Sequence, residues 1–472
     1  MTRPNILLVT DDQHRFDFYG GGRVAALQTP HFDRLKAEGV TLANSFSNCP
    51  ICMPTRFTWC YGLYANQGAT RLTNNRHSWP THLKSMPSVL QEQGYHTALV
   101  GKLHSHQGLY QIDLCDHVEE ARARGFDDVL ETSGKSLAYW LDCNWTHHLA
   151  RRGLLDRYRQ DCRGRMKQLG GQERYEPSFL APEDTMDGYI GDQCRRWLER
   201  YDSAEPFFLH ASFCGPHFPL DPATDYFRQY TPDQMPEPEC VADPQSARRW
   251  QELRAVYCAL ITQVDEEIGR LIATLQQQGL LEDTIIFFAS DHGDMIGHHD
   301  RFGKGPAYDT SCRTPCIVRL PGRVNAGTVL NDLVEAVDLP CTIMEAAGCG
   351  DDPGALLPST PGRSFWKYLH GAAVEHRQWA YAEMGAGLNG GPDGWRMCRD
   401  RRWKYVMDFH GPDTLYDLQT DPWECCNLAD DPAQAERISL MRRRLIESMG
   451  RCVAPNLHDP IPRDDWWPPS NA

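Results

Sequence analysis

Four short runs of almost continuous hydrophobic residues stand out along the chain, and each is rich in β-branched or aromatic side chains. They are residues 5–10 (NILLVT), 97–100 (TALV), 206–212 (PFFLHAS) and 284–290 (TIIFFAS). Strands that helices cover on both faces have this composition. Between the runs, apolar residues recur at helical spacing, as in residues 88–93 and 255–278. This alternation predicts an α/β fold with a large, mostly parallel central sheet and helices on both faces.

The pattern changes near residue 371. Residues 395–400 and 403–409 resemble two strands joined by a turn, residues 414–418 resemble a third strand, and residues 433–449 have helical spacing. This order predicts a helix packed on an antiparallel sheet.

We therefore expect a main α/β domain over residues 1–371 and a smaller C-terminal α+β subdomain over residues 372–472. Residues 111–200 are charged and only partly periodic, which indicates an insertion with helices of its own near the rim of a site.

The composition is that of a folded globular protein, with 472 residues, 41% of them hydrophobic and 24% charged. The net charge of −15 argues against nucleic acid or an anionic membrane as the main partner. No apolar stretch approaches the ~20 residues that span a bilayer, and the start of the chain has no signal-peptide pattern, so we expect a cytoplasmic protein.

The 18 cysteines are scattered, and in the cytoplasm most would stay thiols, so no disulfide is assumed. Cys49 and Cys52 form a Cys-x-x-Cys pair, but no second pair accompanies them to complete a zinc site. They are better explained as two unrelated loop cysteines.

Ionisable residues follow each of the four hydrophobic runs. The first run leads to Asp11-Asp12, the second to Gly-Lys102-x-His104, the third to Gly-Pro-His217 and the fourth to Asp291-His292-Gly. Ligand crevices in open α/β sheets lie beyond the carboxyl ends of the strands. A single cluster could be a helix cap or a surface turn, but four in succession predict one shared site.

The carboxylates Asp11, Asp12 and Asp291 together with His292 are suitable ligands for a divalent cation. Ca²⁺ and Mg²⁺ prefer oxygen ligands, and one imidazole also suits Mn²⁺. The alternative is that an aspartate caps a helix and that His292 is a hydrogen-bonded turn residue.

Cys52 precedes a segment that can be helical, with Pro54 in its first turn. The amide groups and the dipole at a helix N-terminus stabilise negative charge, which suits a nucleophile or an anionic ester. Arg56 falls one turn later on the same face. The alternative is a buried structural cysteine beside a surface arginine.

Taken together, these motifs resemble the sulfatase family of the alkaline-phosphatase-like superfamily. They are Cys52-x-Pro54-x-Arg56, the strand leading to Asp11-Asp12, Gly101-Lys102-x-His104, Asp291-His292-Gly293 followed by Gly303-Lys304-Gly305, and the late segment 415–428 (LYDLQTDPWECCNL). They occur in the family's order from residue 5 to about residue 428.

The resemblance implies a role for each matching residue. Cys52 would be oxidised by a maturation enzyme to Cα-formylglycine, the nucleophile, and Arg56 would steady it. Asp11, Asp12, Asp291 and His292, with the nucleophile, would hold one divalent cation, Ca²⁺ in most sulfatases and often Mn²⁺ in phosphonate monoester hydrolases, with Mg²⁺ also open. The basic residues that would clasp the sulfuryl oxygens and assist the leaving group are Lys102, His104, His217 and Lys304.

Three positions depart from the usual family pattern. Thr55 replaces a serine in the cysteine motif, and His292 stands where many arylsulfatases have asparagine, as in choline-sulfatase-like and phosphonate-hydrolase-like members. Counting from Asn5 places Asp12 at the first family aspartate, so either Asp11 or Gln13 would be the additional ligand.

These observations favour an enzyme that hydrolyses small sulfate monoesters through a formylglycine derived from Cys52. One alternative is a phosphonate monoester or phosphodiester hydrolase of the same superfamily. From a different class, the chain could be a catalytically silent anion-binding homologue in which Cys52 is never converted.

Overall fold

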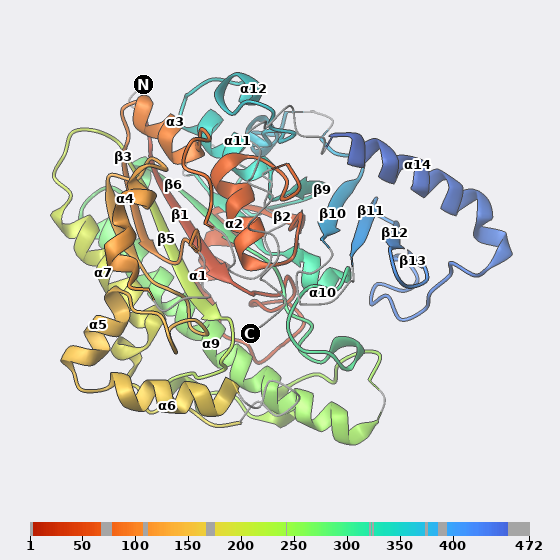
Figure 1. The fold of residues 1–472 in the computed structure, drawn as a ribbon, viewed down its shortest axis with the longest axis horizontal. Coiled ribbons are helices and arrows are strands. Elements are labelled where there is room, and N and C mark those ends of the chain that lie inside the picture. The colour runs from red at the N-terminus through yellow and green to blue at the C-terminus, as the bar shows by residue number, and fades with distance from the viewer. Residues whose placement is uncertain are drawn as a thin grey trace, which may run out of the picture.

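The four predicted strands lie side by side at the centre of the molecule (Figure 1). In the computed structural model, β1 (Asn5–Asp12) pairs in parallel with β5 (Phe207–Pro216) and with β6 (Thr284–Ser290), and β3 (His96–Gly101) pairs in parallel with β5. Their carboxyl ends therefore lie at one edge, as predicted. The structure describes residues 3–67, 78–106, 112–166, 175–241, 243–320, 322, 325–372, 376–385 and 394–451.

Five further strands complete this sheet within the described residues, in the order β4-β3-β5-β1-β6-β8-β2-β7 with β9 beside β2. The pairs β6–β8, β2–β8 and β2–β7 are antiparallel, and the other pairs are parallel. The mostly parallel sheet is thus confirmed. The added strands are β2 (Gly39–Phe46), β4 (Asp128–Glu131), β7 (Arg313–Thr314), β8 (Cys316–Arg319) and β9 (Thr328–Glu335).

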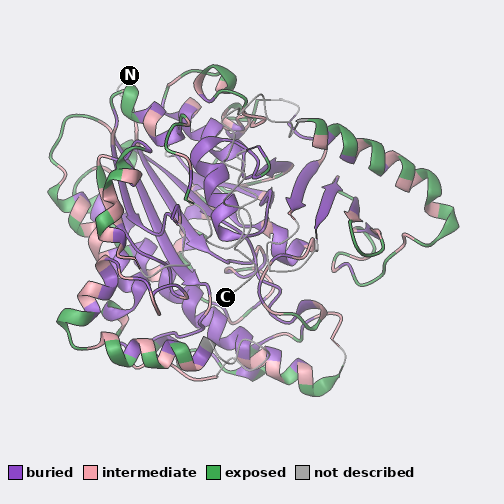
Figure 2. Cartoon of the chain, in the orientation of Figure 1, coloured by how far each residue is buried: buried purple, intermediate pink, exposed green. Residues whose placement is uncertain are grey.

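Alternate side chains of β1 enter two different hydrophobic cores. Leu7 and Val9 pack with helices α7 and α9, whereas Ile6 and Leu8 pack with α2, α3 and α11. Helices therefore cover both faces, and β1, β5 and β6 are buried along their length except at Asn5, the first residue of β1 (Figure 2). The α-helices before residue 370 are α1 (Pro30–Glu38), α2 (Cys52–Tyr61), α3 (Met86–Glu92), α4 (Val118–Arg122), α5 (Asn144–Arg151), α6 (Leu155–Met166), α7 (Met186–Arg200), α8 (Thr224–Phe227), α9 (Pro244–Gln277), α10 (Asp309–Cys312), α11 (Asp338–Ala346), α12 (Pro353–Leu356) and α13 (Trp366–Leu369).

The C-terminal part forms a separate four-stranded antiparallel sheet covered by one long helix, as predicted. Met441 and Leu445 of the helix pack on Tyr405 and Leu415 of the sheet, and the opposite face of the helix is exposed (Figure 2). The elements are β10 (Ala380–Met384), β11 (Trp395–Arg399), β12 (Trp403–Asp408), β13 (Thr414–Asp417) and α14 (Ala435–Arg451). The domain boundary near residue 371 stays a prediction.

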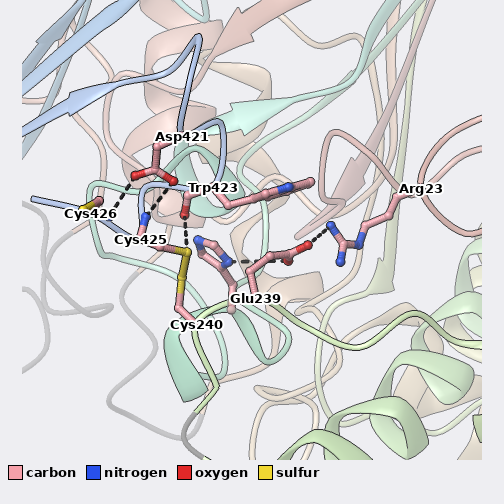
Figure 3. Close-up of a disulfide and its surroundings, with 8 residues drawn as sticks. Arg23, Glu239, Cys240, Asp421, Trp423, Cys425 and Cys426 are labelled. Atoms are coloured by element: carbon pink, nitrogen blue, oxygen red, sulfur yellow. Dashed lines mark hydrogen bonds and ion pairs between the residues drawn. A yellow bond between two sulfur atoms is a disulfide. The ribbon is translucent and has the colours of Figure 1, made fainter.

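A disulfide joins Cys240, just before α9, to Cys425 in the loop after β13 (Figure 3). The sequence analysis assumed no disulfide, and this assumption is wrong for one pair. Nothing in the sequence indicated this pair, because the two positions are 185 residues apart in the chain. Most other described cysteines are buried thiols, as expected, and Cys426 beside the disulfide is an exposed one.

Among the described residues, no helix has the length and apolarity needed to cross a bilayer.

Candidate active site

Cys52 is the first residue of α2 and lies at the carboxyl edge of the central sheet. Its thiol Sγ lies 3.1 Å from His292 Nε2, 3.2 Å from Lys304 Nζ and 3.5 Å from Asp12 Oδ1. Burial and Asp12 oppose ionisation of the thiol, but the neighbouring cations outweigh both and lower its pKa. The side chain is 4% exposed, so a nucleophile here would react in a site shielded from bulk water.

The turn before Cys52 is held by Thr55, the residue that departs from the family's serine. Its hydroxyl donates to the carbonyl of Cys49 (2.8 Å) and also contacts Ser47 Oγ (2.7 Å). Cys49 itself is a buried free thiol whose pKa burial raises well above its usual value. The hydroxyl at position 55 therefore holds this turn in place, and threonine supplies that hydroxyl where the family usually has serine.

Four residues bring possible metal ligands together. One ligand atom from each of Asp12, Cys52, Asp291 and His292 lies within 4.8 Å of all the others, and all four residues are buried. Two carboxylates, a sulfur and an imidazole form a donor set that fits a divalent cation. Of the predicted ligands, the structure brings these four together.

Two basic residues hold the carboxylates of this cluster. Arg56 Nε donates to Asp291 Oδ2 (2.8 Å), and Lys102 Nζ donates to Asp12 Oδ2 (2.5 Å). Burial alone would raise the pKa of Asp12, but the charges of Lys102 and Arg56 hold it well below its ordinary value. Asp12 is thus kept ionised, and the hydrogen bonds orient both carboxylates.

Lys304 reaches the cluster from the loop after β6. Its Nζ donates to Gln13 Oε1 (2.7 Å) and to His217 Nε2 (2.6 Å), in addition to its contact with Cys52. Gly303 and Gly305 flank it with φ of 81° and 112°, values that side chains other than glycine rarely adopt. These glycines let the loop turn back toward the cluster.

His217 presents one ring nitrogen to Lys304. Its Nδ1 donates to the carbonyl of Phe218 (2.5 Å), so Nε2 carries the lone pair that accepts from Lys304. Burial, followed by the charge of Lys304, lowers the pKa of His217 well below its usual value. The imidazole is therefore neutral and orients the lysine.

His104 follows Lys102 by two residues and borders the cluster. Its backbone N–H donates to Glu131 Oε1 (3.2 Å), and its φ of 64° turns the chain sharply after β3. Burial, then the charges of Lys102 and Arg56, lower its pKa well below the ordinary value. His104 thus lies near these cations.

Asp11 lies outside this metal-ligand cluster, so the structure does not bring it together with the other predicted ligands. Successive side chains of a strand point to opposite faces, so Asp11 and Asp12 cannot both face the site. Asp11 Oδ2 instead contacts His14 Nδ1 (2.6 Å), and the pair is buried. Gln13, the alternative left open by the sequence, faces the cluster through its contact with Lys304.

Comparison with known proteins agrees with this geometry. The profile of the family described as Sulfatase matches residues 4–349, and that of N-sulphoglucosamine sulphohydrolase, C-terminal, matches residues 297–450. The chain belongs to the sulfatase family. It is 27% identical to an arylsulfatase of Clostridium perfringens over 95% of this chain and 94% of that protein.

Two further comparisons broaden this result. The chain is 29% identical to the multifunctional alkaline phosphatase superfamily protein PehA of Trinickia caryophylli, over 92% of this chain and 93% of PehA. The crystal structure of the phosphonate monoester hydrolase of Agrobacterium radiobacter superposes with a TM-score of 0.78 at 24% identity, covering 96% of each chain. This member of the sulfatase family therefore has the predicted alkaline-phosphatase-like fold.

Three residues of this candidate site were missed in the sequence analysis. Asp294 accepts from Gly303 N (3.0 Å) and from Gln13 Nε2, and it closes the loop that carries Lys304. Ser212 Oγ accepts from Arg56 Nη1 (2.8 Å), and Trp395 Nε1 donates to the carbonyl of Gly305 (3.0 Å). Asp294 could have been suspected from the sequence, because it lies two residues after His292. Trp395 could not, because it is distant in sequence from the other site residues.

Proposed function

We propose that this sulfatase-family protein hydrolyses sulfate monoesters with a formylglycine made from Cys52 and with one bound divalent cation. The observation that carries the proposal is the position of Cys52 Sγ, which lies 3.1–3.5 Å from His292, Lys304 and Asp12. The hydrated aldehyde would supply a nucleophile that an unmodified thiol does not provide. A formylglycine-generating enzyme is then a required partner.

The donor set supports a hard cation, with Ca²⁺ preferred over Mn²⁺ or Mg²⁺. Asp12, Asp291 and His292 would hold it, and Gln13 Oε1 is better placed than Asp11 to complete the set. The cation would supply fixed positive charge beside the ester oxygens.

The chain's own basic groups would bind and orient the ester. Lys102 and Arg56 donate to the carboxylates of Asp12 and Asp291 and so neutralise their charge. Lys304 is the ammonium that lies in contact with Cys52, so it would bind the transferred group. Charge moves to the leaving oxygen as the ester breaks, and Lys304 is placed to donate a hydrogen bond to that oxygen.

His217 supports Lys304 in this proposal. Its Nε2 accepts from the lysine, so the neutral ring holds the ammonium in position and does not itself present a proton to the ester. In this proposal His217 orients Lys304. His104 lies on the side of the site from which the leaving group departs.

A second candidate is hydrolysis of phosphonate monoesters or phosphodiesters. The similarity to PehA, which is named a multifunctional protein, favours keeping it. His292 in place of asparagine also supports it by resemblance. The Lys102-x-His104 pair is the feature that favours sulfate.

The experiment is a mass measurement of the peptide that contains Cys52, followed by an assay with matched sulfate, phosphate and phosphonate esters. Conversion to the aldehyde lowers the peptide mass relative to the thiol. We expect converted protein to be active, with sulfate esters preferred. A protein that retains the thiol after coexpression with a maturation enzyme would be the silent homologue, and preference for a phosphonate would establish the second candidate.

Cys52→Ala supplies the variant test. We expect it to abolish turnover while thermal unfolding stays unchanged, because the side chain contributes chemistry more than core volume. Cys60→Ala is the matched control, since Cys60 is a buried thiol of the same helix that lies outside the cluster. Activity above a few per cent in Cys52→Ala would overturn the assignment of the nucleophile.

A further inference from the structure

A second group of metal-ligating side chains lies in the segment between β3 and β4. Ligand atoms of His106, His117 and Glu120 all lie within 4.8 Å of one another. His117 belongs to a 3₁₀ turn (Leu114–His117) and Glu120 to α4, whereas His106 follows β3. Three different local structures thus bring two imidazoles and one carboxylate to one point.

The distances within this group match those between ligands on one ion. His106 Nδ1 lies 3.3 Å from Glu120 Oε2, and His117 Nδ1 lies 3.0 Å from Glu120 Oε1. Two ligand atoms bound tetrahedrally to zinc at ~2.0–2.1 Å are roughly 3.3 Å apart. The two rings are 5.1 Å apart between centroids and tilted by 52°, so both can turn a nitrogen toward the carboxylate.

His106 supplies an independent reason to expect a ligand. It is 5% exposed, and both of its nitrogens face carboxylates, with Nε2 3.6 Å from Glu131 Oε2. Among the residues that the structure describes, Nε2 has no hydrogen-bond partner. A neutral imidazole has one N–H and one lone pair, so one nitrogen would direct its lone pair at a carboxylate.

A metal ion removes this conflict. When Nδ1 binds the ion, Nε2 carries the proton and can donate to Glu131, an arrangement that metal-bound histidines usually adopt. Arg124 supplies a positive charge near Glu120. Its Nη2 lies 3.8 Å from Glu120 Oε2 and also donates to the carbonyl of Trp79.

We infer that His106, His117 and Glu120 form a second metal site that binds a borderline divalent ion such as Zn²⁺, with Glu131 fixing the orientation of His106. Two imidazoles and one carboxylate favour Zn²⁺ over Ca²⁺, so this site differs in preference from the oxygen-rich cluster at Cys52. The site does not depend on the proposed sulfate chemistry.

Glu131 connects the second metal site to the candidate active site. Its Oε2 faces His106, and its Oε1 accepts from the backbone N–H of His104. An ion bound at the second site would therefore steady the chain just after Lys102. Its expected effect is to hold this segment in place.

The test is a Zn²⁺ titration of the full chain in saturating Ca²⁺, with competition against a chelator, repeated with Co²⁺ to observe its absorption bands. We expect one tightly bound Zn²⁺ per chain and a tetrahedral Co²⁺ spectrum. His117→Ala and Glu120→Gln, which change partly exposed side chains, should each weaken Zn²⁺ binding ~10-fold or more. Asp291→Asn should leave this binding intact.

His96→Ala is the matched control, because His96 pairs with Asp128 (2.8 Å) but joins none of the metal-ligand groups found in the described part of the chain. It should leave Zn²⁺ binding unchanged. Absence of tight binding would overturn the inference and leave His106 bonded to a protonated Glu131. Binding that persists in His117→Ala but is lost in His147→Ala would also overturn it, by assigning the ion to Asp113, Cys115 and His147.

Discussion

Gln13 and Asp11 have opposite surroundings although both adjoin Asp12. Gln13 Oε1 faces Lys304 and the cluster, whereas Asp11 is bonded to His14. We expect Gln13→Ala to weaken binding of the active-site cation ~10-fold or more, since even loss of an outer partner can cost that much. Asp11→Asn is the matched control and should keep the metal. Metal content measured after dialysis against graded chelator decides between them, and the reverse order would make Asp11 the ligand.

Lys304 should matter most when the leaving group is poor. Its Nζ lies 3.2 Å from Cys52 Sγ, and it can donate where negative charge develops. We expect Lys304→Ala to lower kcat ~10²-fold or more for alkyl sulfates, and much less for aryl esters with acidic leaving groups. Lys367→Ala, which removes an exposed lysine paired with Asp351, should change neither rate. Equal losses for both ester classes would make Lys304 a ground-state binding residue.

At the scale of single residues, the sequence was enough to predict the site residues that follow the ends of strands. It was not enough where the role of a residue depends on which side chains meet in the folded protein. Asp12, Asp291, His292 and Lys102 could be found because each directly follows a hydrophobic run. The choice between Asp11 and Gln13 could not be made, because it depends on where the strand ends and which face each side chain takes. Gln13 has φ of 71°, so the regular alternation of β1 stops at that residue.

The C-terminal sheet holds the loop that carries Lys304. Trp395 of β11 donates from Nε1 to the carbonyl of Gly305, and both Arg399 and Lys404 form ion pairs with Asp309. Trp395→Phe keeps an aromatic ring but removes this donor, which costs ~1 kcal/mol or more because the carbonyl loses its partner.

We expect Trp395→Phe to lower kcat ~10-fold with little change in KM, since a displaced lysine reduces transition-state contacts more than binding. Rescue of the rate with good leaving groups would identify the effect as one of Lys304 position. Trp403→Phe is the matched control, because Trp403 is similarly buried in the same sheet but packs with α14. Equal losses in the two variants would indicate general damage to the sheet.

At the scale of elements, the sequence predicted those with strong periodicity and missed those with mixed composition. Helix α9 begins at Pro244, eleven residues before its predicted start, because its first turns are polar and are fixed by the Asp243 cap. β2 (GVTLANSF) and β10 (AYAEM) were not predicted. Both contain small or polar residues, and their strand form comes from neighbours distant in sequence.

At the scale of the whole molecule, the Cys240–Cys425 disulfide links the α/β core to the C-terminal part. It closes a loop of 185 residues, and loss of loop-closure entropy for that length corresponds to about 5 kcal/mol in the unfolded chain. We expect Cys425→Ser to lower the free energy of unfolding by up to about this amount, measured in denaturant. Activity under mild conditions should remain.

Cys426→Ser is the matched control, because Cys426 is the exposed thiol next to the disulfide. It should leave stability unchanged. Equal stability of Cys425→Ser and the unaltered protein would show that the link contributes nothing, and a similar loss in Cys426→Ser would show that both thiols share the bond.

The same disulfide closes residues 240–425 into a covalent ring. Some residues of the candidate active site belong to this ring, and others precede it. Asp291, His292 and Lys304 lie inside the ring, whereas Asp12, Cys52 and Lys102 precede it. A single cut of the backbone inside the ring would leave one covalent molecule, and its two pieces would separate on a denaturing gel only after reduction. A cut between Lys102 and Cys240 would instead release the nucleophile's half of the site whether or not the sample is reduced.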